Sequence, residues 1–158
     1  MTVRRISPPA DFPLSALKAP KDFLDCWEAA PADPSADAAA LARAVMEGMP
    51  NWVRRLLDLR DSIVAPLGLK TARDLAAETG GPERIGFMRV MERRPDRIVL
   101  GEDDSHLDFR VAVTRADGRA LMGTWVRPKN RLGRLYLPLV LPFHDLIVAN
   151  GMRRLERG

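Results

Sequence analysis

The pattern of apolar and polar positions changes near residue 80, where Gly80, Gly81 and Pro82 interrupt the chain. Beyond this break, apolar residues alternate with polar ones in short runs, most clearly from Leu107 to Thr114. Such alternation is typical of a β-strand with one buried and one solvated face. It predicts four strands in the second half of the chain, at residues 85–92, 97–101, 107–114 and 121–126.

The segments between these runs predict how the strands connect. Residues 94–96, 103–105 and 116–118 carry the Pro, Asp, Ser and Gly residues that favour tight turns. Asp117-Gly118 is the strongest of these signals, because this dipeptide is favoured in two-residue β-hairpins. Consecutive strands joined by tight turns predict an antiparallel meander.

The first half of the chain combines one strand-like run with helical ones. Residues 22–28 predict a first strand, in which Phe23, Asp25 and Trp27 share one face and Leu24 and Cys26 share the other. Apolar residues at helical spacing then predict two helices, at residues 38–48 and from Asn51 onward. Residues 71–78 predict one further short helix.

The two ends of the chain differ in character. Four prolines in residues 1–20 predict an irregular lead-in instead of a helix or a central strand. Residues 132–156 are dense in apolar residues and predict a long C-terminal helix with a broad buried face. The order is a strand, two helices, several strands and a long helix, in a single domain of residues 21–158. This order predicts the α+β class.

Charge bears on the class of partner. The formal net charge of the 158 residues is +4, and residues 81–158 carry 15 Lys and Arg against 10 Asp and Glu. No five like charges follow one another, and the few aromatic residues do not interleave with the cations as a stacking platform for nucleic acid requires. We therefore expect no nucleic-acid partner.

Cysteine content and hydropathy bear on location. The single cysteine, Cys26, excludes an intrachain disulfide and a cysteine-cluster metal site, and we interpret it as a small buried apolar residue. Residues 135–148 include two prolines, a histidine and an aspartate, and are too short and too polar to span a bilayer. We expect a cytoplasmic protein without a signal peptide and without a membrane partner.

Residues 102–108 contain four carboxylates and an imidazole, the groups that most often carry acid–base chemistry. A solvated turn and the polar face of a strand explain them better than a metal site, because the two histidines of the chain form no His-x-His or His-x-x-x-His pair. The candidate catalytic residues are His106, Asp108 and His144, which would meet if the last helix begins beside this strand. Neither a metal nor another cofactor is predicted.

Cations flank the start of the last helix, at Arg127, Lys129, Arg131 and Arg134. One interpretation is an anion site at the helix N-terminus. The favoured interpretation is a solvated connection that pairs with the acidic turn.

Several segments resemble the bacterial family known as domain of unknown function 2867. They are residues 52–61, 66–68, 104–110 and 126–136, and Pro142-Phe143-His144. The order of elements is also that of the helix-grip fold of the START-related and pollen-allergen-like superfamily. The resemblance implies a curved antiparallel sheet wrapped around the C-terminal helix with an apolar cavity between them, and it implies no particular reaction.

We therefore interpret the chain first as a binding module for a small apolar or amphipathic molecule held between the sheet and the long helix. The predicted ligand-binding residues are Trp52, Phe87, Trp125, Tyr136 and Phe143, with Arg127 or Asn130 at the mouth. One alternative is a cyclase- or isomerase-type enzyme that uses His106 with Asp108 or His144. Another is a protein-interaction domain without a cavity. The sequence leaves open whether a reaction is catalysed and whether the chain forms a homodimer.

Overall fold

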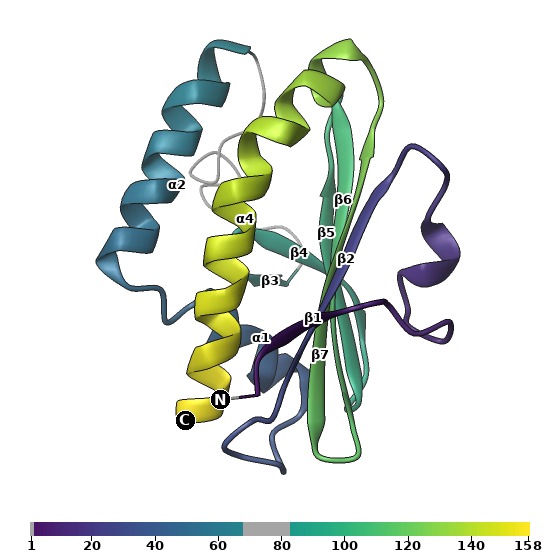
Figure 1. The fold of residues 1–158 in the computed structure, drawn as a ribbon, viewed down its shortest axis with the longest axis vertical. Helices are drawn as coiled ribbons and strands as arrows, with labels where there is room; N and C mark the ends of the chain where they lie inside the picture. Colours follow the sequence, from purple (N-terminus) through teal and green to yellow (C-terminus); the bar gives the residue numbers. More distant parts are fainter. Residues whose placement is uncertain (1, 68–82) are drawn as a thin grey trace.

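The computed structural model describes residues 2–67 and 83–158, in which a curved antiparallel sheet of seven strands packs against a long C-terminal helix (Figure 1). The strands stand in the order β1-β2-β7-β6-β5-β4-β3. Their bounds are β1 Arg4–Ile6, β2 Phe23–Ala29, β3 Arg84–Ile85, β4 Met88–Arg93, β5 Arg97–Asp103, β6 Leu107–Ala116 and β7 Arg119–Pro128. Every neighbouring pair is antiparallel, which confirms the α+β class and the predicted meander.

Among the described residues, three α-helices lie on one side of the sheet (Figure 1). They are α1 Ala38–Met46, α2 Asn51–Val64 and α4 Arg131–Arg157, and short 3₁₀ turns occur at Ser15–Leu17 and Ala65–Leu67. α1 and α4 pack directly on the sheet, and α2 packs beside α4. The two helices predicted after the first strand are therefore confirmed. The helix predicted at residues 71–78 lies outside the described residues.

Turn chemistry sets the connections within the meander. Asp117 and Gly118 both have positive φ, 52° and 72°, as the predicted two-residue hairpin between β6 and β7 requires. The strand predicted at residues 85–92 is divided into β3 and β4, because Gly86 turns the chain with a φ of 62°. A position with this left-handed backbone conformation favours glycine, since glycine has no Cβ.

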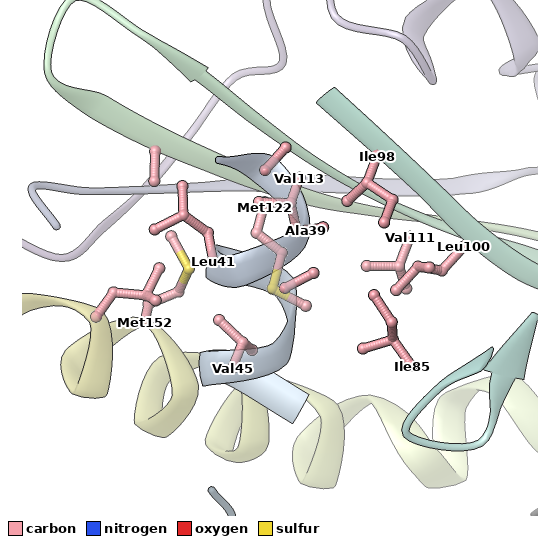
Figure 2. Close-up of a cluster of buried hydrophobic side chains, with 14 of the residues drawn as sticks. Ala39, Leu41, Val45, Ile85, Ile98, Leu100, Val111, Val113, Met122 and Met152 are labelled. Carbon is pink, nitrogen blue, oxygen red and sulfur yellow. The ribbon is translucent and has the colours of Figure 1, made fainter. Parts of the chain in front are cut away.

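The main core lies between the inner face of the sheet and the helices α1 and α4. Figure 2 shows its side chains gathered between these elements, and they include Leu41, Val45, Val113, Met122 and Met152. None of these five residues is more than 4% exposed. Burial of each such side chain contributes about 1.5–3 kcal/mol, so this layer holds α1 and α4 on the sheet.

The outer face of the sheet is covered by the N-terminal segment. Phe12 and Leu14 pack against Cys26 of β2 and Trp125 of β7. The lead-in that we predicted to be irregular also contains β1, which pairs with β2 at the edge of the sheet. Parts of β2 and β7 are thus buried on both faces, and for this reason their sequences do not alternate cleanly.

We expect Cys26 to be unreactive in the folded protein. The residue is fully buried, and burial, assisted by the charges of Asp25 and Glu28, raises the pKa of its thiol to about 12. The nucleophilic thiolate is then almost absent at neutral pH. Ellman's reagent should label Cys26 only after denaturation, and labelling of the native protein as fast as free cysteine would contradict this burial.

The face of α4 that points away from the sheet carries exposed leucines. Leu135, Leu139 and Leu146 are 65%, 51% and 54% exposed, and their spacing places them on one stripe of the helix. Among the described residues, α4 is the one helix long and apolar enough to cross a membrane by length and composition. This is weak evidence for a membrane span, because core helices of water-soluble proteins meet the same criterion.

Candidate functional site

A cavity of about 190 Å³ lies between the inner face of the sheet and α4. Strands β5, β6 and β7 line it on one side, and α4 lines it on the other. Met46 of α1, Leu57 of α2 and Met49 of the segment between these helices also line it. Most of its lining side chains are apolar. The polar ones, among the described residues, are Glu102, Asp104, Thr124, Tyr136 and His144.

The strand register decides which residues line this cavity. Directly paired residues of neighbouring strands share a face of the sheet. Phe109 of β6 pairs with Glu102 of β5 and with Val126 of β7, and all three line the cavity. Side chains alternate along each strand, so Thr124 of β7 lies on the same face.

His144 of α4 is bonded to Asp25 of β2. Its Nε2 lies 2.9 Å from Oδ2 of Asp25, and the two side chains are 21% and 1% exposed. Phe23 packs edge-on against the imidazole, with the ring centroids 5.9 Å apart. The imidazole is therefore held against the sheet at one side of the cavity that it lines.

Two further donors hold the Asp25 carboxylate. The backbone N–H of Thr124 donates to Oδ1 at 3.0 Å, and the Trp27 indole N–H donates to Oδ2 at 3.0 Å. Thr124 lies directly opposite Asp25 in the β2–β7 ladder, and Trp27 is two residues along the same strand. The carboxylate thus has three hydrogen bonds with His144 included, which offset the loss of hydration on burial.

A second buried carboxylate, Glu102 of β5, also lines the cavity. Its Oε2 accepts a hydrogen bond from Arg84 at 3.1 Å, and the two side chains are 10% and 14% exposed. Arg84 donates in addition to the carbonyl of Phe87 at 2.9 Å. The charge of Glu102 is therefore matched by a buried cation.

The structure separates the predicted ligand-binding residues into two groups. Phe87, Tyr136 and Phe143 line the cavity, whereas Trp52, Trp125, Arg127 and Asn130 do not. Trp52 is 44% exposed on α2, and Trp125 lies on the outer face of β7 with the N-terminal segment over it. Trp125 is next to Thr124 in a strand, so the two side chains point to opposite faces.

Arg127 belongs to a cluster on the outer face, built around Asp22. Its guanidinium donates to both carboxylate oxygens of Asp22 at 2.9–3.2 Å and lies 4.9 Å from the centroid of Trp125, whose indole N–H also donates to Asp22 at 2.9 Å. Burial raises the pKa of Asp22, but the hydrogen bonds from Arg127, Ala19 and Trp125 outweigh it and lower that pKa overall. Arg127 thus joins the N-terminal segment to β7, away from the predicted position at the mouth.

Asn130 is the N-cap of α4. Its Oδ1 accepts a hydrogen bond from Gly133 N at 3.0 Å, and its Nδ2 lies 2.9 Å from Nδ1 of His106. The side chain thereby ties the start of α4 to the turn between β5 and β6.

The three candidate catalytic residues have separate partners. His106 is bonded to Asn130, Asp108 forms a 2.7 Å ion pair with Lys129, and His144 is bonded to Asp25. The structure therefore does not bond His106 to Asp108 or to His144. Asp108 pairs with Asp103 across the β5–β6 hairpin and so points to the outer face, while Leu107 and Phe109 line the cavity. The ion pair of Lys129 agrees with the interpretation that the cations before α4 pair with the acidic residues 102–108.

Sequence reasoning missed Asp25 as a functional residue. The pattern placed it with Phe23 and Trp27 on one face of a strand, and a carboxylate between aromatic residues on a buried face needs a polar partner. That signal was available. The partner of Asp25, His144, is 119 residues away, and no local sequence pattern connects the two residues.

Asp25, His144 and Asp145 form the one group, among the described residues, whose potential metal-ligand atoms lie within 4.8 Å of one another. One imidazole and two carboxylates are ligands that zinc accepts. Here Nε2 of His144 is bonded to Asp25, and Oδ2 of Asp145 lies 3.5 Å from Arg5. A metal ion bound through these atoms would have to replace the bond between His144 and Asp25.

A family model described as Protein of unknown function (DUF2867) matches residues 19–151 of the chain. No curated protein and no solved structure matches the chain significantly. The matched region runs from before β2 into the last turns of α4, so it includes Asp25, His144 and the residues that line the cavity.

Proposed function

We propose that this chain, which belongs to the DUF2867 family of proteins of unknown function, binds a small and mostly apolar molecule in the cavity between the sheet and α4. The observation that carries the proposal is the cavity itself. A space of about 190 Å³ with an apolar lining and a few polar groups has the features of a small-molecule site.

The lining indicates the chemistry of the ligand. Thr124 and His144 both bond to Asp25, so these two lining residues lie close together. A single carbonyl or hydroxyl group of the ligand would find its hydrogen-bond partners there. Apolar atoms would contact residues such as Phe109 and Met122, and methionine adapts its shape to different ligands.

We also infer a relationship to the helix-grip domains of the START-related superfamily. Its support is the order of elements: a strand, two helices, an antiparallel meander and a long helix on the inner face of a curved sheet. The resemblance implies a ligand space between sheet and helix, which is where the cavity of this chain lies.

A substitution that fills the cavity tests the proposal. Val140 lines the cavity, whereas the preceding residue, Leu139, belongs to the exposed stripe of α4. We expect Val140→Trp to weaken binding of the apolar dye N-phenyl-1-naphthylamine at least about 10-fold, because the indole occupies the ligand space. Leu139→Trp, the matched control, should change the affinity less than about 2-fold. Fluorescence titration measures both.

Native mass spectrometry gives the same test without a dye. The wild type should carry a small molecule whose mass is lost on denaturation, and Val140→Trp should lack it. If Val140→Trp is unstable, Val140→Phe fills less space and serves instead. Equal dye affinities in two folded Trp variants would contradict the cavity as the binding site. A discrete dimer that binds no dye would favour the interaction-domain alternative, for which the stripe of Leu135, Leu139 and Leu146 is an available surface.

A further inference from the structure

The cavity wall contains a buried carboxylate bonded to an imidazole that lines the cavity. Asp25 is 1% exposed at its side chain, and its oxygens accept hydrogen bonds from Thr124 N, the Trp27 indole and Nε2 of His144 at 2.9–3.0 Å. These bonds fix the position of the carboxylate. Asp25 in turn fixes the orientation of the His144 ring, which also packs against Phe23.

The bond to Asp25 also selects the tautomer of His144. A carboxylate only accepts hydrogen bonds, so Nε2 carries a proton, and in the neutral imidazole the lone pair lies on Nδ1. Within the described part of the chain, Nδ1 has no hydrogen-bond partner. The imidazole that carries this lone pair lines the cavity.

We propose that His144 is a general base positioned by Asp25, and that the cavity is an active site for proton transfer on a small, mostly apolar carbonyl compound. This inference rests on the proposed function, because the substrate must first enter the cavity. His144 is the catalytic residue, since its Nδ1 meets the substrate. Asp25 acts through His144 and is a positioning residue.

The reaction needs no co-reactant. Nδ1 of His144 takes a proton from the carbon next to the carbonyl group, the C–H electron pair forms the C=C bond of the enolate, and the carbonyl π pair moves to oxygen. The imidazolium then returns the proton to a different carbon of a conjugated enolate, which completes an isomerisation. A base held in place beside its substrate contributes on the order of 10²–10⁴-fold to such a step.

Neighbouring groups stabilise both charges that form. Asp25 stabilises the imidazolium, as the carboxylate of a catalytic triad does. Thr124 carries a hydroxyl group and lines the same cavity, so it can donate a hydrogen bond to the enolate oxygen. Glu102, the other buried carboxylate of the lining, is paired with Arg84 and is not needed for this step.

Ring opening of 5-nitrobenzisoxazole tests the base with a defined probe. A base removes the proton from the carbon beside the ring nitrogen, the C–H pair completes a nitrile, and the N–O bond breaks with its electron pair on oxygen, which gives a coloured cyano-nitrophenolate. We expect the wild type to catalyse this opening with saturation kinetics. His144→Gln should lower kcat at least about 100-fold.

Two further variants separate the role of each residue. Asp25→Asn favours the opposite tautomer of His144 and should lower kcat at least about 10-fold, with KM within about 3-fold of the wild type. His106→Gln replaces the other histidine, which is bonded to Asn130 and does not line the cavity, and should keep the wild-type kcat. Protection of Cys26 from Ellman's reagent verifies that each variant is folded.

The outcomes decide between the two proposals. Equal kcat in the wild type and folded His144→Gln, or a wild-type rate no higher than that of free imidazole, would overturn the catalytic role. The unreactive analogue 5-nitroindazole reports binding alone. If it displaces N-phenyl-1-naphthylamine while ring opening is absent, the binding proposal stands and the general base is rejected. If neither displacement nor ring opening occurs, both are rejected.

Discussion

Replacement of Asp25 by Ala should lower the free energy of unfolding by about 2–4 kcal/mol. The buried backbone N–H of Thr124 and the half-buried indole N–H of Trp27 lose their acceptor, and an unsatisfied buried donor costs about 1–3 kcal/mol. His144 loses its partner as well, but its side chain is 21% exposed and can reach water. Urea unfolding followed by tryptophan fluorescence measures the change.

The control for this experiment is the same substitution at an exposed site. Asp11 lies in the exposed turn before Phe12, and Asp11→Ala should change the free energy of unfolding by less than about 0.5 kcal/mol. Asp25→Asn keeps one acceptor oxygen and should be less destabilising than Asp25→Ala. A loss below about 1 kcal/mol for Asp25→Ala would show that the carboxylate does not hold these donors.

Replacement of Gly133 by Ala should lower the free energy of unfolding by about 2–3 kcal/mol, although alanine normally stabilises a helix by about 1 kcal/mol relative to glycine. Gly133 lies in the first turn of α4, against the turn between β5 and β6. A Cβ built there would be 2.2 Å from the carbonyl oxygen of His106. That oxygen accepts a hydrogen bond from Lys129 N at 2.9 Å, so it cannot move without loss of this bond.

Gly48→Ala is the matched control. A Cβ at Gly48 would have no neighbour closer than 3.5 Å, and the nearest atom belongs to the flexible side chain of Arg154. The free energy of unfolding should then change by less than about 0.5 kcal/mol. If Gly133→Ala instead stabilises the protein as helix propensity alone predicts, α4 does not begin in contact with the carbonyl of His106.

The elements of the fold were largely predictable because they depend on local chemistry. Asp117-Gly118 turns the chain where the dipeptide predicted a hairpin, and alternation around Val111 placed β6. The differences have identifiable causes. Gly86 divides the strand predicted at residues 85–92. β1 forms within the proline-rich lead-in because β2 offers an edge for pairing, and that edge exists only in the folded sheet.

The site was less predictable because it depends on which face of each strand meets α4. In β7, Trp125 and Val126 are both apolar, so their sequence does not indicate which of them faces the helix. Phe12 and Leu14 cover the outer face and make it as dry as the inner one. The sequence around Trp125 therefore does not indicate that its side chain faces away from the cavity. For this reason Trp125 is included among the predicted ligand-binding residues.

Interactions between residues that are close in sequence determine the strands, the hairpin turns and the long helix, and the sequence alone was therefore sufficient to predict them. The hydrogen-bond partners of the two histidines were decided by the tertiary structure. Asp108 was close to His106 in sequence, yet the hairpin register turned it to the outer face, and His144 found Asp25 at a separation of 119 residues. Such pairs arise when burial of apolar surface brings distant segments together, and the polar groups on the surfaces that meet must then satisfy one another.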